Sequence, residues 1–368
     1  MKETTTINVL KLRQSKWDIY IGKINAKDLY RMSRADIMSI NETGKGYDGV
    51  QRELDKSRVS SIEDYLESLD ATFPNSIILN IDKKYVIDRN DNMLEIEVTP
   101  NTFSIIDGQH RLAGFENGKI DSFDLNVSIF IGLTKTQQQR IFNTINKEHT
   151  KVNKSQSFYT EINDEILTPR KFIAEISSLF ATDVTSPWYK KIKLLGKKDE
   201  LSEEGIISLD AFSSPLISLI YNDKYFFKIR NFLMENNNNL ELLNSSSLEK
   251  HKSIFWELYI KQDIKTMYKI YYNYFNAIKK TLPNDWGNSS SILTKTTGYN
   301  AFLRLFKDLS ILGLDKGDLS EEYFFSKLNV LNNMDGRFNS NEFASSGDQS
   351  SAKLYEIIKK KVITLFNF

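Results

Sequence analysis

Residues 103–119 read FSIIDGQHRLAGFENGK, and this stretch decides the fold of the N-terminal half. The apolar run FSII predicts a buried strand, and Leu112 and Phe115 after the motif predict a helix. Gly108, between the two, favours a tight turn. The sequence therefore predicts a strand, a glycine turn and a helix in direct succession.

The turn from Asp107 to Arg111 carries several groups that bind phosphate. A helix N-terminus presents unpaired amide groups, and a glycine lets a phosphate approach the backbone closely. Arginine adds a forked donor, histidine a titratable one and glutamine a neutral amide. We predict an anion site whose catalytic candidates are Asp107, Gln109, His110 and Arg111, with Gly108 and Arg111 also binding the phosphate.

Three roles are open to Asp107. Its carboxylate can hold a divalent cation, orient a water molecule or cap the helix. Asp107 is therefore the candidate metal ligand of the sequence. The alternative for the whole motif is a structural turn with a solvated arginine, because such short patterns also occur without a site.

The rest of the chain predicts a mixed fold in two parts. Residues 7–12, 17–22, 76–82, 93–98 and 125–131 are typical of strands, and residues 26–35 and 50–69 of helices. From residue 134 onward the pattern is helical, with long candidates at 137–146, 158–179 and 251–282. We expect an α+β protein, with an α/β core in residues 1–150 and a helical domain in residues 151–368 packed on it.

Composition excludes several classes of function. Lys and Arg total 49 against 48 for Asp and Glu, so any nucleic-acid contact needs a local patch of charge. The chain has no cysteine, which excludes disulfides, thiolate nucleophiles and cysteine-ligated metals. No apolar run resembles a signal peptide or a membrane span, so we expect a cytoplasmic protein without a membrane partner.

The DGQHR string and its surroundings resemble the DGQHR-domain family, which includes the DndB and DpdB proteins of bacterial DNA phosphorothioation and DNA 7-deazaguanine systems. GVQRELDKSRVSSIEDYL and FPNSIILNI precede the string, and VSIFIGLTKTQQQRIFNTINKEHTKVNKS follows it, in the order typical of the family. SPWYKKIKLLGK, LTKTTGYNAFLRLF and SSGDQSSAKLYEII extend the resemblance over nearly the whole chain.

The resemblance implies a ParB/sulfiredoxin-like fold in the N-terminal half, with nucleotide phosphates bound at the helix after the turn. Sulfiredoxin has a cysteine where this chain has Gln109, so reduction of a sulfinic acid is excluded. In ParB-like sites a helix with Gln, Arg and Asn approaches the triphosphate. Three polar residues of residues 137–146 are therefore nucleotide-binding candidates: Arg140, Asn143 and Asn146. A solvated polar face is the alternative.

Two further candidates lie outside these segments. Arg52 is a nucleotide-binding candidate, although a surface salt bridge with Glu53 or Asp55 would explain it equally. The run YKKIKLLGKK is the candidate DNA contact, through Lys190, Lys191, Lys193, Lys197 and Lys198. Its lysines, next to Trp188 and Tyr189, fit phosphate contact and base stacking, but a solubilising surface is also possible.

Two functions follow from these observations. The first is a nucleoside triphosphatase that uses ATP or another NTP with Mg²⁺ and serves DNA-modification enzymes of the same operon, in phage defence or modification. The second is a non-catalytic DNA-binding regulator of such an operon. A nuclease is disfavoured because acidic and histidine ligands are not clustered. Under the first hypothesis, Arg111→Ala abolishes nucleotide binding and leaves the melting temperature nearly unchanged.

Overall fold

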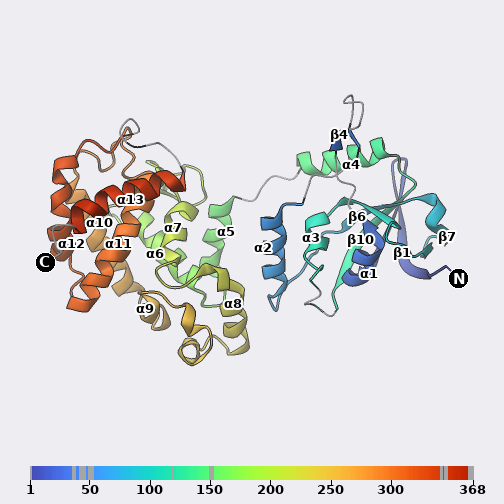
Figure 1. The fold of residues 1–368 in the computed structure, drawn as a ribbon, viewed down its shortest axis with the longest axis horizontal. Helices are drawn as coiled ribbons and strands as arrows, with labels where there is room; N and C mark the ends of the chain where they lie inside the picture. Colours follow the sequence, from blue (N-terminus) through green and yellow to red (C-terminus); the bar gives the residue numbers. More distant parts are fainter. Residues whose placement is uncertain are drawn as a thin grey trace. The chain divides into compact units, whose positions relative to one another are not determined.

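The computed structural model describes residues 2–34, 39–40, 47–48, 54–117, 120, 122–148, 153–339, 343 and 347–363, with backbone alone at 39–40, 47–48 and 146–148. These residues form two compact units, Met1–Lys151 and Val152–Phe368. The first unit holds a mixed sheet and the second is mainly helical (Figure 1). The predicted α+β class, with a helical C-terminal part, is therefore confirmed. The packing of the helical part on the first domain stays a prediction.

An eight-stranded sheet organises the first unit. Its strands, in spatial order, are β3 (Ser33–Arg34), β9 (Phe103–Asp107), β6 (Ile77–Ile81), β10 (Asp124–Ile131), β2 (Trp17–Asn25), β1 (Thr4–Gln14), β8 (Met93–Glu97) and β7 (Val86–Arg89). β10 pairs with β6, and β3 with β9, in parallel, whereas the other neighbours are antiparallel. A two-stranded ladder of β4 (Ser39–Ile40) and β5 (Tyr47–Asp48) is separate.

Alternation along the strands gives the sheet two apolar faces. Ile105 and Ile129 belong to one core, which also receives buried residues of α1 (Ala26–Met32), α2 (Lys56–Leu66) and α3 (Gln109–Ala113). Their neighbours Ile106 and Phe130 point to the opposite face, because successive side chains of a strand alternate. There they meet Ile141 and Phe142 of α4 (Lys135–Glu148), which lies above the strands in Figure 1.

The second unit is built from helices around an aromatic core. Its helices are α5 (Lys154–Thr160), α6 (Pro169–Thr182), α7 (Leu209–Ile217), α8 (Phe226–Glu235), α9 (Trp256–Ile260), α10 (Ile264–Thr281), α11 (Thr296–Lys316), α12 (Glu321–Leu328) and α13 (Asp348–Ile363). A short ladder pairs β11 (Ile192–Lys193) with β12 (Ile207–Ser208). Rings of Trp188, Phe212, Phe275 and Tyr299 contact one another in the core.

Three predicted elements differ from those observed. The helix expected at 251–282 is interrupted, because Gln262 adopts a left-handed backbone with φ 50° and Asp263 caps a new helix, α10. The helix expected at 158–179 is also divided: α5 ends at Thr160, and α6 begins at Pro169 with Thr168 as its N-cap. Residues 86–89 form strand β7, although DRND at 88–91 reads as a turn.

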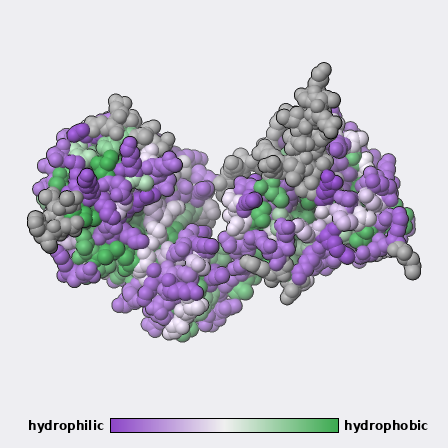
Figure 2. All heavy atoms as spheres, in the orientation of Figure 1, coloured by the Kyte–Doolittle hydropathy of each residue, from purple (hydrophilic) through white to green (hydrophobic). Residues whose placement is uncertain are grey.

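The visible surfaces of both units are mostly hydrophilic, with apolar residues scattered among polar ones (Figure 2). Within the part of the chain that the structure describes, no helix is both long and apolar enough to cross a bilayer.

Candidate nucleotide site

The turn from Asp107 to Arg111, here called the DGQHR turn, joins β9 to α3. Gly108 has φ 101° and ψ 11°, a conformation that side-chain-bearing residues rarely adopt. A Cβ atom at this position would lie only 2.5 Å from Cδ1 of Ile77, which is fully buried in β6. The turn therefore requires glycine for its backbone conformation and for the close approach of β6.

Arg111 fastens this turn to the segment that enters β6. Its guanidinium donates to the carbonyl oxygens of Asn75 (2.6 Å) and Ser76 (3.2 Å) and to the Asp107 carboxylate (3.0 Å). The side chains of Arg111 and Asp107 are only 19% and 29% exposed. Burial lowers the pKa of Arg111 and the nearby carboxylate opposes this, but an arginine stays protonated. Arg111 is therefore a structural clamp as well as a candidate phosphate ligand.

This geometry disagrees with the expectation that Arg111→Ala leaves stability unchanged. The sequence expectation treated the guanidinium as free for phosphate, but several of its donors are used by the protein's own oxygen atoms. Its removal leaves a half-buried carboxylate without this cation. A loss of stability is therefore expected.

Asp107, the last residue of β9, forms an ion pair with Arg111. Among the residues described, no group of three or more histidine, cysteine or acidic side chains could hold a metal. One carboxylate suits Mg²⁺ only where substrate phosphates and water complete the octahedral shell. The metal role of Asp107 accordingly stays a prediction that depends on a bound nucleotide.

His110 links the turn to α2. Its Nε2 accepts a hydrogen bond of 3.1 Å from the backbone N–H of Asp55, the N-cap residue of α2. Nε2 is therefore unprotonated in this arrangement, and a proton on Nδ1 makes the ring neutral. Burial lowers the pKa of His110, Arg58 lowers it further, and the carboxylates of Asp55 and Asp107 act in the opposite direction.

This hydrogen bond predicts a pH-dependent contribution to stability. A histidine with a lowered pKa in the folded state stabilises most above its ordinary value of about 6.5, and the contribution is lost as pH falls below it. At pH 7.5 His110→Ala should lower the free energy of unfolding by about 1 kcal/mol, which is the net contribution of one hydrogen bond. Thermal melts of wild type and variant should converge between pH 7.5 and pH 5.5. A constant difference across this range would show that protonation of His110 is unimportant.

The DGQHR turn forms one wall of a cavity of about 780 Å³. Arg58, exposed on α2, supplies a cation beside His110. Apolar side chains cover the remaining wall: Ile62, Pro74, Ile78, Phe142 and Ile145. The cavity thus combines a polar turn and a cation with an apolar surface, at a volume typical of small-molecule sites.

Helix α4 reaches this cavity with its apolar face. Phe142 and Ile145 line the cavity, whereas Arg140 and Asn143 are exposed and are not among its lining residues. The apolar residues of α4 pack toward the sheet, and a helical period of 3.6 turns positions 140 and 143 to the other side. The structure therefore does not bring the predicted pair to the DGQHR turn. Asn146 lies in α4, but its side chain is outside the described part.

A family model described as "DndB: DNA-sulfur modification-associated" matches residues 7–186, which include the DGQHR turn and all of the eight-stranded sheet except the first residues of β1. Over these residues the chain is similar to the DndB family. The resemblance inferred from the DGQHR string is thereby confirmed. A search of curated proteins found no match.

One similar solved structure is the C-terminally truncated chromosome-partitioning protein ParB from Caulobacter crescentus, complexed with CTP-gamma-S. It is 10% identical, and the match covers 66% of this chain and 98% of that chain, with a TM-score of 0.26. At this TM-score the likeness supports no argument about this chain. Its fold class follows from its own strands and helices.

Arg52, another predicted nucleotide ligand, lies outside the described residues. Arg58, six residues further along, is the upstream arginine that lines the cavity. Arg58 belongs to the same stretch, GVQRELDKSRV, in which the sequence favoured Arg52. The sequence offered no signal that Phe142 and Ile145 would face the same space, because the contact depends on how α4 packs on the sheet.

The predicted DNA-binding lysines lie in the second unit, and part of their charge is neutralised. Lys190 and Lys191 form ion pairs of 3.1 and 2.5 Å with Glu203 and Glu204. Lys197 and Lys198 are exposed, and Lys193 is half-buried. Trp188 is only 1% exposed, so the predicted stacking of bases on this ring does not fit its burial. DNA binding through the five lysines stays a prediction.

Proposed function

We propose that this protein binds a nucleotide in the cavity beside the DGQHR turn and hydrolyses it in support of a DNA-sulfur modification system. The observation that carries the proposal is the composition of the cavity. A glycine turn and Arg58 line about 780 Å³ together with five apolar side chains. A nucleotide combines the same two characters, since it has charged phosphates and a flat base.

In this proposal Arg58 and the backbone around Gly108 bind the phosphates of the nucleotide. Arg58 is exposed and belongs to an 11-residue helix, so its side chain can extend toward a ligand without breaking the core. Gly108 lines the cavity, so its backbone can meet a ligand oxygen atom there. Arg111 adds positive charge from behind the turn while it holds Asp107. His110 offers Nδ1–H as a further donor in its neutral form.

The base of the nucleotide packs against the apolar side chains of the cavity. Phe142 of α4 offers an aromatic ring, and flat bases stack on such rings without a strong preference for one base. Ile145 and Ile62 extend this surface from two different helices. This end accordingly supports ATP as one substrate among the nucleoside triphosphates.

Hydrolysis would depend on Asp107. In this proposal its carboxylate, held by Arg111, orients the attacking water or a phosphate-bound Mg²⁺, and positive charge from Arg58 stabilises the transition state. The partners of this activity would be the modification enzymes of the same operon and their DNA. The regulator alternative would need a nucleic-acid surface, and the pairing of Lys190 and Lys191 gives it no added support.

The experiment is a calorimetric titration of ATP, GTP and CTP, each with Mg²⁺, into wild type, Arg58→Gln and Arg89→Gln. Arg89 is an exposed arginine on β7 and is not among the cavity-lining residues, so it controls for the loss of one surface charge. We expect one nucleotide per wild-type chain, and about tenfold weaker binding in Arg58→Gln, the effect of one charged hydrogen bond. Arg89→Gln should match wild type.

The same samples give phosphate release. Asp107→Asn should retain binding and lose turnover, because the amide preserves the shape but not the charge of the carboxylate. No binding of any nucleotide would contradict the proposal. Equal affinities of wild type and Arg58→Gln would contradict the assignment of Arg58 as a phosphate ligand.

A further inference from the structure

A second cavity, of about 720 Å³, lies at the other end of the same strands. The DGQHR turn follows the end of β9, whereas the second cavity lies where β9 begins, at Phe103 and Ser104. It also includes Asn80 and Asp82 at the end of β6, and Gly132 after β10. Because β6 runs antiparallel to β9 and parallel to β10, the start of β9 and the ends of β6 and β10 lie side by side.

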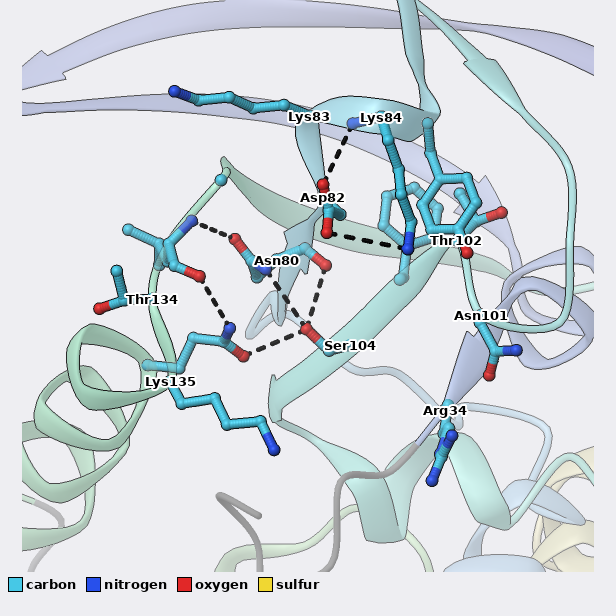
Figure 3. Close-up of a pocket in the computed structure, with 15 residues that line it drawn as sticks. Arg34, Asn80, Asp82, Lys83, Lys84, Asn101, Thr102, Ser104, Thr134 and Lys135 are labelled. Atoms are coloured by element: carbon cyan, nitrogen blue, oxygen red, sulfur yellow. Dashed lines mark hydrogen bonds and ion pairs between the residues drawn. The ribbon is translucent and has the colours of Figure 1, made fainter. Parts of the chain in front are cut away.

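Positive side chains surround this cavity. Arg34, Lys83, Lys84 and Lys135 line it, and Asp82 is the one carboxylate among the described lining residues. In Figure 3 Lys83 and Lys84 lie above the hollow and Lys135 and Arg34 below it. The whole chain has 49 basic and 48 acidic residues, so this excess is local.

The one acidic group does little to neutralise this charge. The closest approach of Lys84 Nζ to the Asp82 carboxylate is 4.0 Å, and the two side chains are 64% and 60% exposed. Exposed pairs at such a distance contribute little. The Asp82 carboxylate instead accepts from the backbone N–H of Lys84 at 3.1 Å, which caps the short turn at Lys83–Tyr85.

Neutral amides and a hydroxyl form a fixed floor. The buried Asn80 side chain accepts from the backbone N–H of Leu133 at 2.8 Å. Ser104 Oγ donates to Gln138 Oε1 at 3.1 Å, and Gln138 Nε2 donates to the carbonyl oxygen of Leu133 at 3.1 Å. This network joins β6, β9 and α4, so the cavity floor is built from mutually satisfied groups.

Helix α4 directs its N-terminus to this cavity through Thr134 and Lys135. Thr134 and Gln137 form reciprocal hydrogen bonds of 2.9 and 3.3 Å that define the start of the helix. The positive end of a 14-residue helix dipole adds to the surrounding side-chain charge.

We propose that this second cavity, called the lysine cavity, binds the phosphoryl groups of a small anion. A concave space with four cations, one loosely paired carboxylate and a fixed neutral floor recognises several negative charges within a few ångströms of one another. Linked phosphates carry their charge in this arrangement. The site is independent of the nucleotide site proposed above, since Arg58 and the DGQHR turn do not line it.

The test is a titration of sodium triphosphate into the full chain at 50 and 150 mM salt. We compare wild type with Lys83→Gln/Lys84→Gln, and with Lys261→Gln/Lys265→Gln as a control of equal charge change at exposed positions of the second unit. Binding should weaken about tenfold or more in the first variant, as expected for lost charged hydrogen bonds. The control should bind as wild type does.

Three further results decide the assignment. Arg58→Gln should retain the component of binding that Lys83→Gln/Lys84→Gln loses, which separates the lysine cavity from the nucleotide site. Equal weakening in the control variant, or no effect of the cavity variant, would overturn the proposal. So would duplex DNA that binds through Lys83 and Lys84 while triphosphate does not, because the cavity would then contact a nucleic-acid backbone instead of a small anion.

Discussion

Replacing Arg111 with methionine is expected to lower the free energy of unfolding of the first unit by about 3 kcal/mol. Methionine keeps most of the side-chain length but donates no hydrogen bonds. The carbonyl oxygens of Asn75 and Ser76 lose their donor, and the half-buried Asp107 carboxylate loses its cation. Breaking an ion pair in such surroundings is costly because one charge stays behind.

Amide hydrogen exchange of β6 and β9, measured in the full chain, reports this loss in the first unit. Arg111→Lys is the matched control, since it keeps the charge but cannot reach two carbonyl oxygens and the carboxylate together. It should recover only part of the protection. A double variant with Asp107→Asn should be less destabilised than the sum of the two single variants. If the amides of β6 and β9 exchange as slowly in Arg111→Met as in the wild type, Arg111 does not stabilise the contact between the DGQHR turn and β6.

Gly108→Ala is expected to lower the free energy of unfolding of the first unit by a similar amount, about 3 kcal/mol. One part arises from the backbone, because alanine strongly disfavours φ 101°. The other part is steric, since the new Cβ atom would lie 2.5 Å from Cδ1 of Ile77 and 3.1 Å from a guanidinium nitrogen of Arg111. Ile77 is fully buried, so its side chain has little room to move.

Two variants separate these parts in thermal and urea unfolding. Gly347 also has φ 101°, but nothing lies within 4 Å of a Cβ atom built there, so Gly347→Ala should show the backbone cost alone, about 1 kcal/mol. Ile77→Val removes Cδ1, and should therefore relieve part of the defect when combined with Gly108→Ala. Equal costs at positions 108 and 347 would show that the approach of β6 is not tight.

The strands and the DGQHR turn were predictable because their signals are local. Residues 103–106 are apolar, Gly108 allows the turn, and the alternation along residues 125–131 reports two covered faces. Strand β7 was missed since Asp88 and Arg89 are typical of turns, although they pair with Glu95 and Leu94 at the sheet edge. An edge strand needs no buried side chains, so polarity does not exclude it.

The sequence drew attention to the turn that lines the cavity, but it did not predict the contacts of the turn. The partners of Arg111 lie 35 and 36 residues upstream, and only the folded sheet brings their carbonyl oxygens to the guanidinium. Polar residues of α4 suggested a phosphate-binding face, but Phe142 and Ile145 face the cavity because the apolar side of α4 packs on the sheet. Trp188 is next to the lysine run in the sequence, yet its ring lies in the aromatic core.

The most direct test of the central claim is a crystal structure of the full chain with a non-hydrolysable nucleoside triphosphate and Mg²⁺. We expect density in the cavity between α2, the DGQHR turn and α4, with phosphates at Arg58 and Gly108 and the base against Phe142. A well-ordered chain with this cavity empty at saturating nucleotide, or a nucleotide bound only elsewhere, would contradict the claim.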